Sequence, residues 1–391
     1  MGVRFLVSRL PVFAAAGVLV AYLALASHVL GSLPAAWTSL RVPAGTFVFA
    51  DTFIVTNSID CLLAGKDPYR EISCDPYNRL YNYPPAWLLL RHADVTSRST
   101  VALGTGMAIL MFCALLVVFS TEGWVSGLIV FAAILSFPMF FALERGNIDL
   151  IVFSTMVFGL GWAQYLRERQ RRLSRCALIV LLTILKIYPV AMVTVLTRGR
   201  RGWLRAGVVA LVSVAALVAT AGSRLHEIKA NTPQDTWVSF GSFDVVEFVH
   251  LRFFPMATGP IVGHKHWIGS VAALGLGALA AWYGAANRPR LSTYLPAIDI
   301  DTGIGAIAAA GLSVYCMVFL LGANYDYRLI FLLAPLGFLL RGTPRAPVIR
   351  PLPVAMLLLS YLMTYHLNSA ALHEAFEPVV FLTMCAWLGL S

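Results

Sequence analysis

Charged side chains that interrupt apolar runs are the residues of this sequence with the clearest chemical potential. Asp51 is the first carboxylate of the chain, and it follows a long apolar start. A carboxylate at such a boundary suits a general base, which must accept a proton from a bound reactant. The alternative is a helix N-cap, a position that Asp also favours. Asp51 is therefore the first candidate catalytic residue, with Asp60 and Asp67 as replacements.

A compact group of charges occupies residues 144–149, which read Glu-Arg-Gly-Asn-Ile-Asp between two apolar runs. Ionisable groups are costly to bury in such surroundings and are functional candidates by default. Arg145 could neutralise a phosphate, while Asn147 and Asp149 could bind a sugar or an acceptor. The structural alternative is an ion pair of Arg145 with Glu144 or Asp149.

A similar group occupies residues 324–328, which read Asn-Tyr-Asp-Tyr-Arg. The planar guanidinium of Arg328 matches the geometry of phosphate oxygens. Asp326 could bind a sugar or an acceptor. Mutual pairing of these two side chains is the structural alternative.

Lys186 is a lone cation in an apolar stretch that also holds Pro189. A lysine in such a stretch needs a partner. The functional interpretation is contact with an anionic lipid headgroup such as a polyprenyl phosphate. The alternative is snorkelling to the headgroups of the cytoplasmic leaflet.

Aromatic and histidine side chains add weaker candidates. Tyr69 and Tyr83 stand in stretches rich in Gly and Pro, where they could stack on a sugar beside Asp67, or form the usual aromatic belt. His264 and His266 alternate in a second polar stretch, and they could contact an acceptor or act as a base. A solvated loop is the alternative for both histidines. Their alternate spacing could also bind a metal but is a weak signal, and no CxxC or Cys/His cluster predicts a metal site.

The composition limits the class of protein that could position these residues. The chain has 391 residues, of which 59% are hydrophobic and 12% are charged, and its mean hydropathy is +0.77. These values exclude a soluble globular enzyme and a disordered protein. At roughly 20 residues per span, the apolar content allows about eleven transmembrane helices. The net charge of +10 then reflects arginines in cytoplasmic loops, and we expect no nucleic-acid partner.

The apolar runs predict an all-α integral membrane protein, a single membrane domain over 1–391 with about 10–12 transmembrane helices. Two polar stretches, 50–99 and 222–266, are the expected outer-face loops. The expected spans are 10–31, 100–119, 123–142, 149–166, 203–221, 267–286, 303–321, 327–340, 352–368 and 377–390.

The orientation follows from two arginine clusters, at 167–175 and 198–205, which flank the apolar stretch 176–197. Arginine clusters favour the cytoplasmic side. Pro189 breaks a helix in the middle of the stretch, so we expect a re-entrant hairpin that returns both clusters to the cytoplasm. Both polar stretches then face the outside. Cys61 and Cys74 share the first of them, and a disulfide between them is left open.

Several of these segments together resemble glycosyltransferase family 87, over roughly residues 51 to 340. That family has the GT-C fold and includes actinobacterial α-mannosyltransferases. The resemblance rests on Asp51, 65–69 (Gly-Lys-Asp-Pro-Tyr), 83–85 (Tyr-Pro-Pro), 145–150 (Arg-Gly-Asn-Ile-Asp-Leu), 185–189 (Leu-Lys-Ile-Tyr-Pro) and 327–331 (Tyr-Arg-Leu-Ile-Phe).

The resemblance implies an inverting transferase that moves a single sugar, mannose first among candidates, from a polyprenyl-phosphate-linked donor. The acceptor would be a lipid-linked sugar or a glycan at the outer face of a bacterial cytoplasmic membrane. By the same resemblance Asp51 is the base and Lys186 lies near the lipid phosphate. Arg145 and Arg328 are further phosphate contacts by charge and topology. No cofactor is expected, and dependence on a metal is left open.

Two other function classes compete with this interpretation. A transporter or lipid flippase would carry its binding residues near the bilayer midplane, commonly in repeated halves. A polymerase or ligase of surface polysaccharide would use the same loops and lipid-linked sugars, but would transfer a long glycan. The polar motifs gather at the expected outer face and no repeat is visible, which favours the single-sugar transferase.

Overall fold

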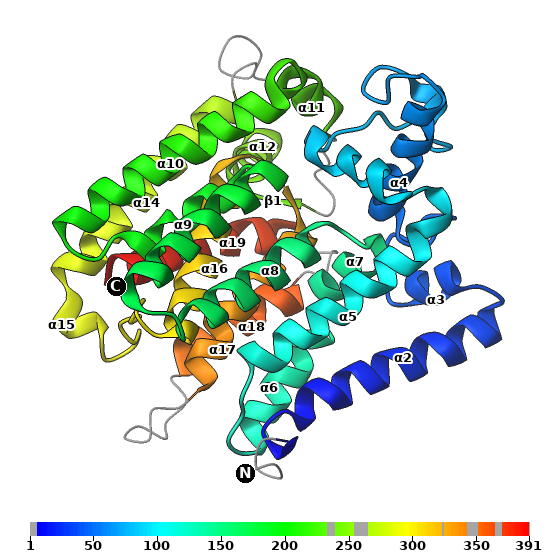
Figure 1. The fold of residues 1–391 in the computed structure, drawn as a ribbon. Helices are drawn as coiled ribbons and strands as arrows, with labels where there is room; N and C mark the ends of the chain where they lie inside the picture. Colours follow the sequence, from blue (N-terminus) through cyan, green and yellow to red (C-terminus); the bar gives the residue numbers. More distant parts are fainter. Residues whose placement is uncertain are drawn as a thin grey trace. The chain divides into compact units, whose positions relative to one another are not determined.

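The computed structural model describes residues 6–232, 239–253, 265–322, 324–341, 351–363 and 370–390. Apart from one short ladder, their regular structure is helical, which confirms the all-α prediction for the described chain (Figure 1). The longer elements are α2 (Leu10–Leu30), α3 (Leu33–Ser39), α4 (Ala50–Leu63), α5 (Thr100–Val118), α6 (Trp124–Ile134), α7 (Phe137–Arg145), α8 (Asp149–Ala163), α9 (Glu168–Leu185), α10 (Arg200–Ala221), α11 (Leu225–Asn231), α12 (Ser242–Phe253), α14 (Lys265–Ala286), α15 (Arg288–Leu291), α16 (Gly303–Leu320), α17 (Leu333–Leu340), α18 (Pro351–Met363) and α19 (Ala370–Leu390).

Shorter 3-10 segments and one β ladder connect them. The segments are η1 (Ile72–Cys74), η2 (Pro85–Ala93), η3 (Ser97–Ser99), η4 (Tyr188–Leu196), η5 (Gly222–Arg224) and η6 (Asp326–Leu332), and the strands are β1 (Ser239–Phe240) and β2 (Asn324–Tyr325). The strands are antiparallel, with Ser239 opposite Tyr325.

Five helices of the described chain are long and apolar enough to cross a membrane, or six if α6 and α7 form one bent span. This supports a membrane protein, while the expected count of ten to twelve spans is not reached among these residues. Several expected spans are divided or short. The helices α6 and α7 meet at 44°, and the run from 327 to 340 is split between η6 and α17. The helix α8 is continuous but has only 15 residues.

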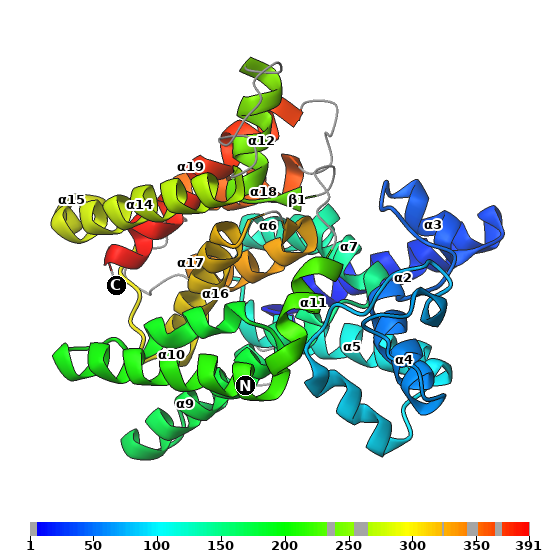
Figure 2. The ribbon, with the colours of Figure 1, turned by 90° about the horizontal axis from the view of Figure 1, so that it is seen from above.

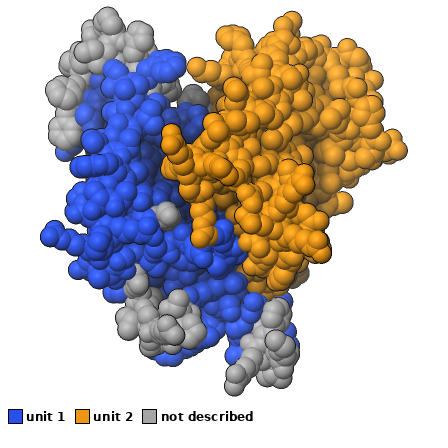
Figure 3. Space-filling model, turned by 60° about the vertical axis from the view of Figure 1, so that its left-hand side comes forward, with its two compact units in different colours: residues 1–15, 118–139, 234–391 blue, residues 16–117, 140–233 orange. Residues whose placement is uncertain are grey.

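The described chain forms two compact units, coloured separately in Figure 3. Unit 1 holds residues 1–15, 118–139 and 234–391, and unit 2 holds residues 16–117 and 140–233.

In unit 2, the chain turns back after α9. Lys186 has extended backbone, α9 ends one residue before it, and η4 starts with Tyr188 and Pro189. Arg175 on α9 donates from Nη1 to the carbonyl of Val195 at 3.3 Å, so η4 lies against α9 and runs back along it. The helix α10 packs on both elements (Figures 1 and 2). The returning chain is the geometry that a hairpin over 176–197 requires.

The stretch 50–99, expected as a polar loop, contains a regular helix in unit 2. The helix α4 covers its first 14 residues and buries Ile54, Val55 and Ile59. Apolar residues at such spacing form a helical stripe that the polar residues between them obscure. A disulfide between Cys61 and Cys74 ties the end of α4 to η1, with 5.5 Å between the Cα atoms.

In unit 1, α14 packs along α19 (Figure 2). Glycines allow the close approach: a Cβ on Gly284 would meet the carbonyl of Ala386, and one on Gly389 would meet that of Ala281. Small residues at helix contacts are typical of membrane proteins. The helix α16 lies in the core of unit 1, because it packs against α14, α17, α19 and η6 and most of its residues are buried.

Candidate functional site

The start of α4 is docked on the turn that holds residues 144–149, and both belong to unit 2. Phe49, in the left-handed region with φ of 58°, precedes the helix and donates its N–H to the carbonyl of Glu144 at 3.1 Å. Thr52 Oγ1 donates to the carbonyl of Gly146 at 2.6 Å. Gly146 has a positive φ of 54°, and a Cβ there would lie 2.5 Å from Thr52 Oγ1. Glycine is therefore required at 146 for this docking.

This docking brings Asp51 to Asn147. Asp51 is half-buried in the first turn of α4, after the cap residue Phe49, so it is not the N-cap that the sequence allowed. Asn147 is fully buried and donates from Nδ2 to Asp51 Oδ2. The side-chain oxygen Oδ1 of Asn147 accepts the backbone N–H of Asp149 at 2.9 Å. Because both ends of the amide are engaged, Asn147 fixes the orientation of the Asp51 carboxylate.

Asp149 continues the chain of contacts to Lys186. The Lys186 ammonium lies 3.2 Å from Asp149 Oδ1, and the hydroxyl of Tyr188 donates to the same oxygen. Asp149 is fully buried and Lys186 is 9% exposed. Asp149 is thus the partner that Lys186 requires in its apolar run. Contacts between neighbours join Asp51, Asn147, Asp149 and Lys186, which come from three separate sequence motifs.

Aromatic rings cover the ammonium of Lys186. Its Nζ lies 5.1 Å from the centre of the Tyr83 ring and 5.7 Å from that of Tyr188, which suits cation–π contact. Trp87, on η2, donates its Nε1–H to the carbonyl of Leu185 at 3.1 Å, so η2 is fastened beside the end of α9.

Arg145 forms an ion pair with Glu144, which is the structural alternative to a phosphate contact. Its Nε lies 3.4 Å from Glu144 Oε2, and its Nη2 donates to the carbonyl of Pro43 at 3.4 Å. Arg145 remains partly exposed, whereas Glu144 is buried. The pair lies on the same turn as Asn147, two to three residues away from the amide that orients Asp51.

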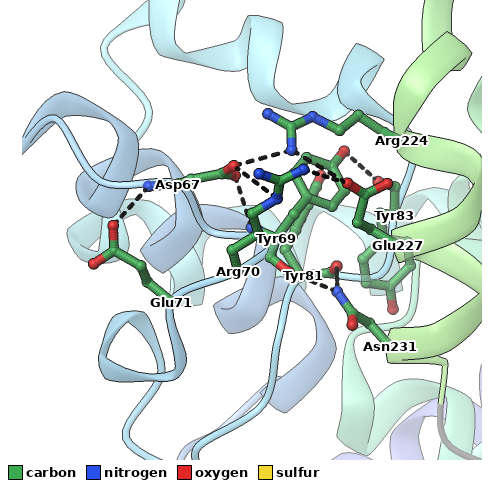
Figure 4. Close-up of polar contacts among 9 residues, drawn as sticks. All are labelled: Asp67, Tyr69, Arg70, Glu71, Tyr81, Tyr83, Arg224, Glu227 and Asn231. Atoms are coloured by element: carbon green, nitrogen blue, oxygen red, sulfur yellow. Dashed lines mark hydrogen bonds and ion pairs between the residues drawn. The ribbon is translucent and has the colours of Figure 1, made fainter.

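A second polar network holds the stretch from Asp67 to Tyr83 against α11 (Figure 4). Arg224 Nη1 lies 2.9 Å from Asp67 Oδ2, and Arg70 Nη2 lies 3.1 Å from Glu227 Oε1. The Tyr69 hydroxyl donates to the carbonyl of Tyr83 at 2.8 Å. Burial raises the pKa of the Tyr69 phenol against the opposing effect of the Arg224 charge, so this hydroxyl stays protonated.

Some residues of the site were not among the sequence candidates. Tyr188 could have been found, because it stands in the quoted segment 185–189. Arg79 pairs with Asp75 at 2.7 Å and donates to the carbonyl of Ala50 at 3.1 Å, which ties η1 to the start of α4. No local pattern marks Arg79, since its partners follow from the fold.

The remaining candidates lie in unit 1. Asp326 is fully buried, and its two oxygens accept no hydrogen bond from the described residues. Burial, followed by the carboxyl of Asp244, raises the pKa of Asp326 to about 8. Arg328 donates to Asn324 Oδ1 and lies over the Tyr327 ring at 5.5 Å.

The two histidine candidates cannot be placed in the site. His264 lies outside the described residues, and for His266 only the backbone, at the start of α14, is described. Within the part of the chain that the structure describes, no group of three His, Cys, Asp or Glu side chains could hold a metal ion.

Comparison of the chain with protein-family profiles, with curated proteins and with solved structures finds no match.

Proposed function

We propose that this protein is a GT-C glycosyltransferase similar to family 87. It transfers a single sugar, mannose first among the candidates, from a polyprenyl-phosphate-linked donor to a lipid-linked or glycan acceptor at the outer face of a membrane. The observation that carries the proposal is the line of contacts from Asp51 through Asn147 and Asp149 to Lys186. It joins a candidate base to a candidate phosphate contact inside one compact unit.

Asp51 would act as the general base. Its carboxylate takes the proton of an acceptor hydroxyl, and the hydroxyl oxygen forms a bond to the anomeric carbon of the donor sugar. The bond from that carbon to the phosphate oxygen breaks on the opposite face, and its electron pair leaves with the polyprenyl phosphate. Asn147 orients Asp51 for this step, which is how positioned side chains lower a barrier.

Lys186 and Arg145 would stabilise the leaving phosphate, because both carry positive charge close to the Asp51 turn. The ammonium of Lys186 carries three N–H donors, so it can contact Asp149 and a phosphate at the same time. The carboxylate of Asp149 would hold the ammonium in position. Asp67 and Tyr69, on the loop that reaches Tyr83, would lie toward the sugar or the acceptor.

Two features of unit 2 support an outer-face site. The disulfide between Cys61 and Cys74 belongs in an oxidising compartment. The contact of Arg175 with the Val195 carbonyl supports a re-entrant hairpin, since it brings the end of η4, just before the arginines of 198–205, back to those of 167–175. Both arginine clusters can then remain on the cytoplasmic side, as their charge favours.

A donor survey tests the proposal. Purified protein in vesicles is supplied with polyprenyl-phosphate mannose, glucose, galactose or arabinose, and with a bacterial lipid extract as acceptor. The proposal expects one radiolabelled sugar to move to a lipid or glycan acceptor, together with release of polyprenyl phosphate. Movement of a donor lipid or a solute across the bilayer, without transfer from any donor, would overturn it in favour of transport. Addition of long glycans would favour the polymerase.

A further inference from the structure

The segment 222–232 fastens the loop that runs from Asp67 to Tyr83 (Figure 4). Arg224 contacts this loop twice: its Nη1 lies 2.9 Å from Asp67 Oδ2, and its guanidinium lies 5.0 Å from the centre of the Tyr69 ring. Asn231 donates from Nδ2 to two backbone carbonyls, those of Tyr69 and Tyr81, each at 3.0 Å. One amide therefore fixes the spacing between the two arms of the loop.

The far end of the same loop covers Lys186. The Tyr69 hydroxyl donates to the carbonyl of Tyr83 at 2.8 Å, and the Tyr83 ring lies 5.1 Å from the ammonium of Lys186. The side chain of Lys186 is only 10% exposed. Contacts between neighbours thus run from Arg224 and Asn231, through two tyrosines, to the cation next to Asp149.

The charges in this network are too exposed to act mainly through stability. The side chains of Arg224 and Asp67 are 32% and 30% exposed, and that of Arg70 is 69% exposed. Ion pairs at such exposure contribute little to folding. Their value lies in geometry: they hold Tyr69 where its hydroxyl reaches Tyr83.

We propose that Arg224 and Asn231 are positioning residues, which keep Tyr83 over Lys186 and so set how tightly Lys186 holds a lipid-linked phosphate. This inference rests on the function proposed above for its effect on phosphate binding. The placement of Tyr83 can be measured without any activity.

The first measurement is the reactivity of Lys186 toward an amine-acetylating reagent, followed by mass spectrometry of the reconstituted full chain. Lys66 and Lys229 are exposed and serve as internal references. The Arg224→Gln and Asn231→Ala variants should each raise acetylation of Lys186 about five- to tenfold, the opening expected from one lost net hydrogen bond. Arg224→Lys should restore most of the protection. His226→Gln, at an exposed position of the same segment, is the matched control and should leave it unchanged.

The second measurement is binding of a fluorescent polyprenyl phosphate to the same vesicles. The two variants should weaken binding by a similar factor, because the ammonium is then held less firmly, while His226→Gln should not. Unchanged acetylation of Lys186 in both folded variants would overturn the positioning role. Raised acetylation with unchanged phosphate binding would also overturn it, because Lys186 would then be uncovered without affecting its expected ligand. Absence of sugar transfer with both effects present would count against the proposed function only.

Discussion

Variants of the ion pair between Lys186 and Asp149 can distinguish the contribution of Lys186 to folding from its contribution to phosphate binding. Its ammonium and carboxylate lie 3.2 Å apart and are almost fully buried. Removing one partner of such a pair leaves an uncompensated charge and costs about 3–5 kcal/mol, whereas replacing both with neutral groups of similar size costs far less. Lys186→Met alone should therefore lower the free energy of unfolding by about that amount.

The double variant Lys186→Met with Asp149→Asn should recover most of the lost stability. The amide side chain introduced at position 149 keeps a carbonyl oxygen that can accept the hydroxyl of Tyr188, so the neutral pair leaves no buried charge. Activity should be lost in the single and in the double variant, because neither has an ammonium for the phosphate. The assay is thermal unfolding in nanodiscs by tryptophan fluorescence, followed by sugar transfer on the same preparations.

Two outcomes would refute this reasoning. A double variant as unstable as Lys186→Met would mean that the charge of Asp149 is not what the lysine compensates. A stable double variant with wild-type transfer would mean that Lys186 has no part in the reaction. The single variant Asp149→Asn completes the cycle and measures the coupling between the two side chains directly.

Three further perturbations have defined outcomes. Gly146→Ala should lower both stability and transfer, because a Cβ would lie 2.5 Å from Thr52 Oγ1 and undock α4; thermal unfolding and initial rates check it. Reduction of the bond between Cys61 and Cys74 should cost about 3 kcal/mol, as loop-closure entropy predicts for some 15 residues, and a reductant should then destabilise wild type but not the Cys61→Ser, Cys74→Ser protein. Asp326→Asn should be more stable than wild type, by an amount that grows as pH rises from about 4 to 8. The native carboxyl, with a pKa of about 8, stays protonated over that range while the unfolded one ionises; equal melting-temperature differences at pH 5 and pH 8 would contradict this.

Local sequence patterns were sufficient to predict the turns at which charged residues interrupt an apolar run. The run around Lys186 and Pro189 predicted a turn, and α9 ends at Leu185. The motif at 144–149 was predicted as a polar junction, and the structure brings its Asn147 to Asp51. These features depend on few residues close in the chain, which is why the sequence reveals them.

Features that depend on distant partners could not be predicted. The docking of α4 requires Phe49 in the left-handed region, where it donates its N–H to the carbonyl of Glu144. Neither residue type predicts that contact. The contacts of Asn231 with Tyr69 and Tyr81 join segments 150 or more residues apart. Apolar composition suggests ten to twelve spans, whereas the described residues hold five or six helices long enough to cross a membrane. Composition measures how much chain can be buried, and bends and 3-10 segments divide that chain only in three dimensions.

A single-turnover comparison of Asp51→Asn with Asp60→Asn tests the central claim most directly. Both carboxylates lie on α4, and the amide at 60 can still accept the N–H of Ser97, as Asp60 does at 3.0 Å. With polyprenyl-phosphate sugar already bound, Asp51→Asn should bind donor normally and transfer no sugar, while Asp60→Asn should transfer at close to the wild-type rate. Transfer by Asp51→Asn at the wild-type rate would contradict the account, because the proton of the acceptor would then go elsewhere.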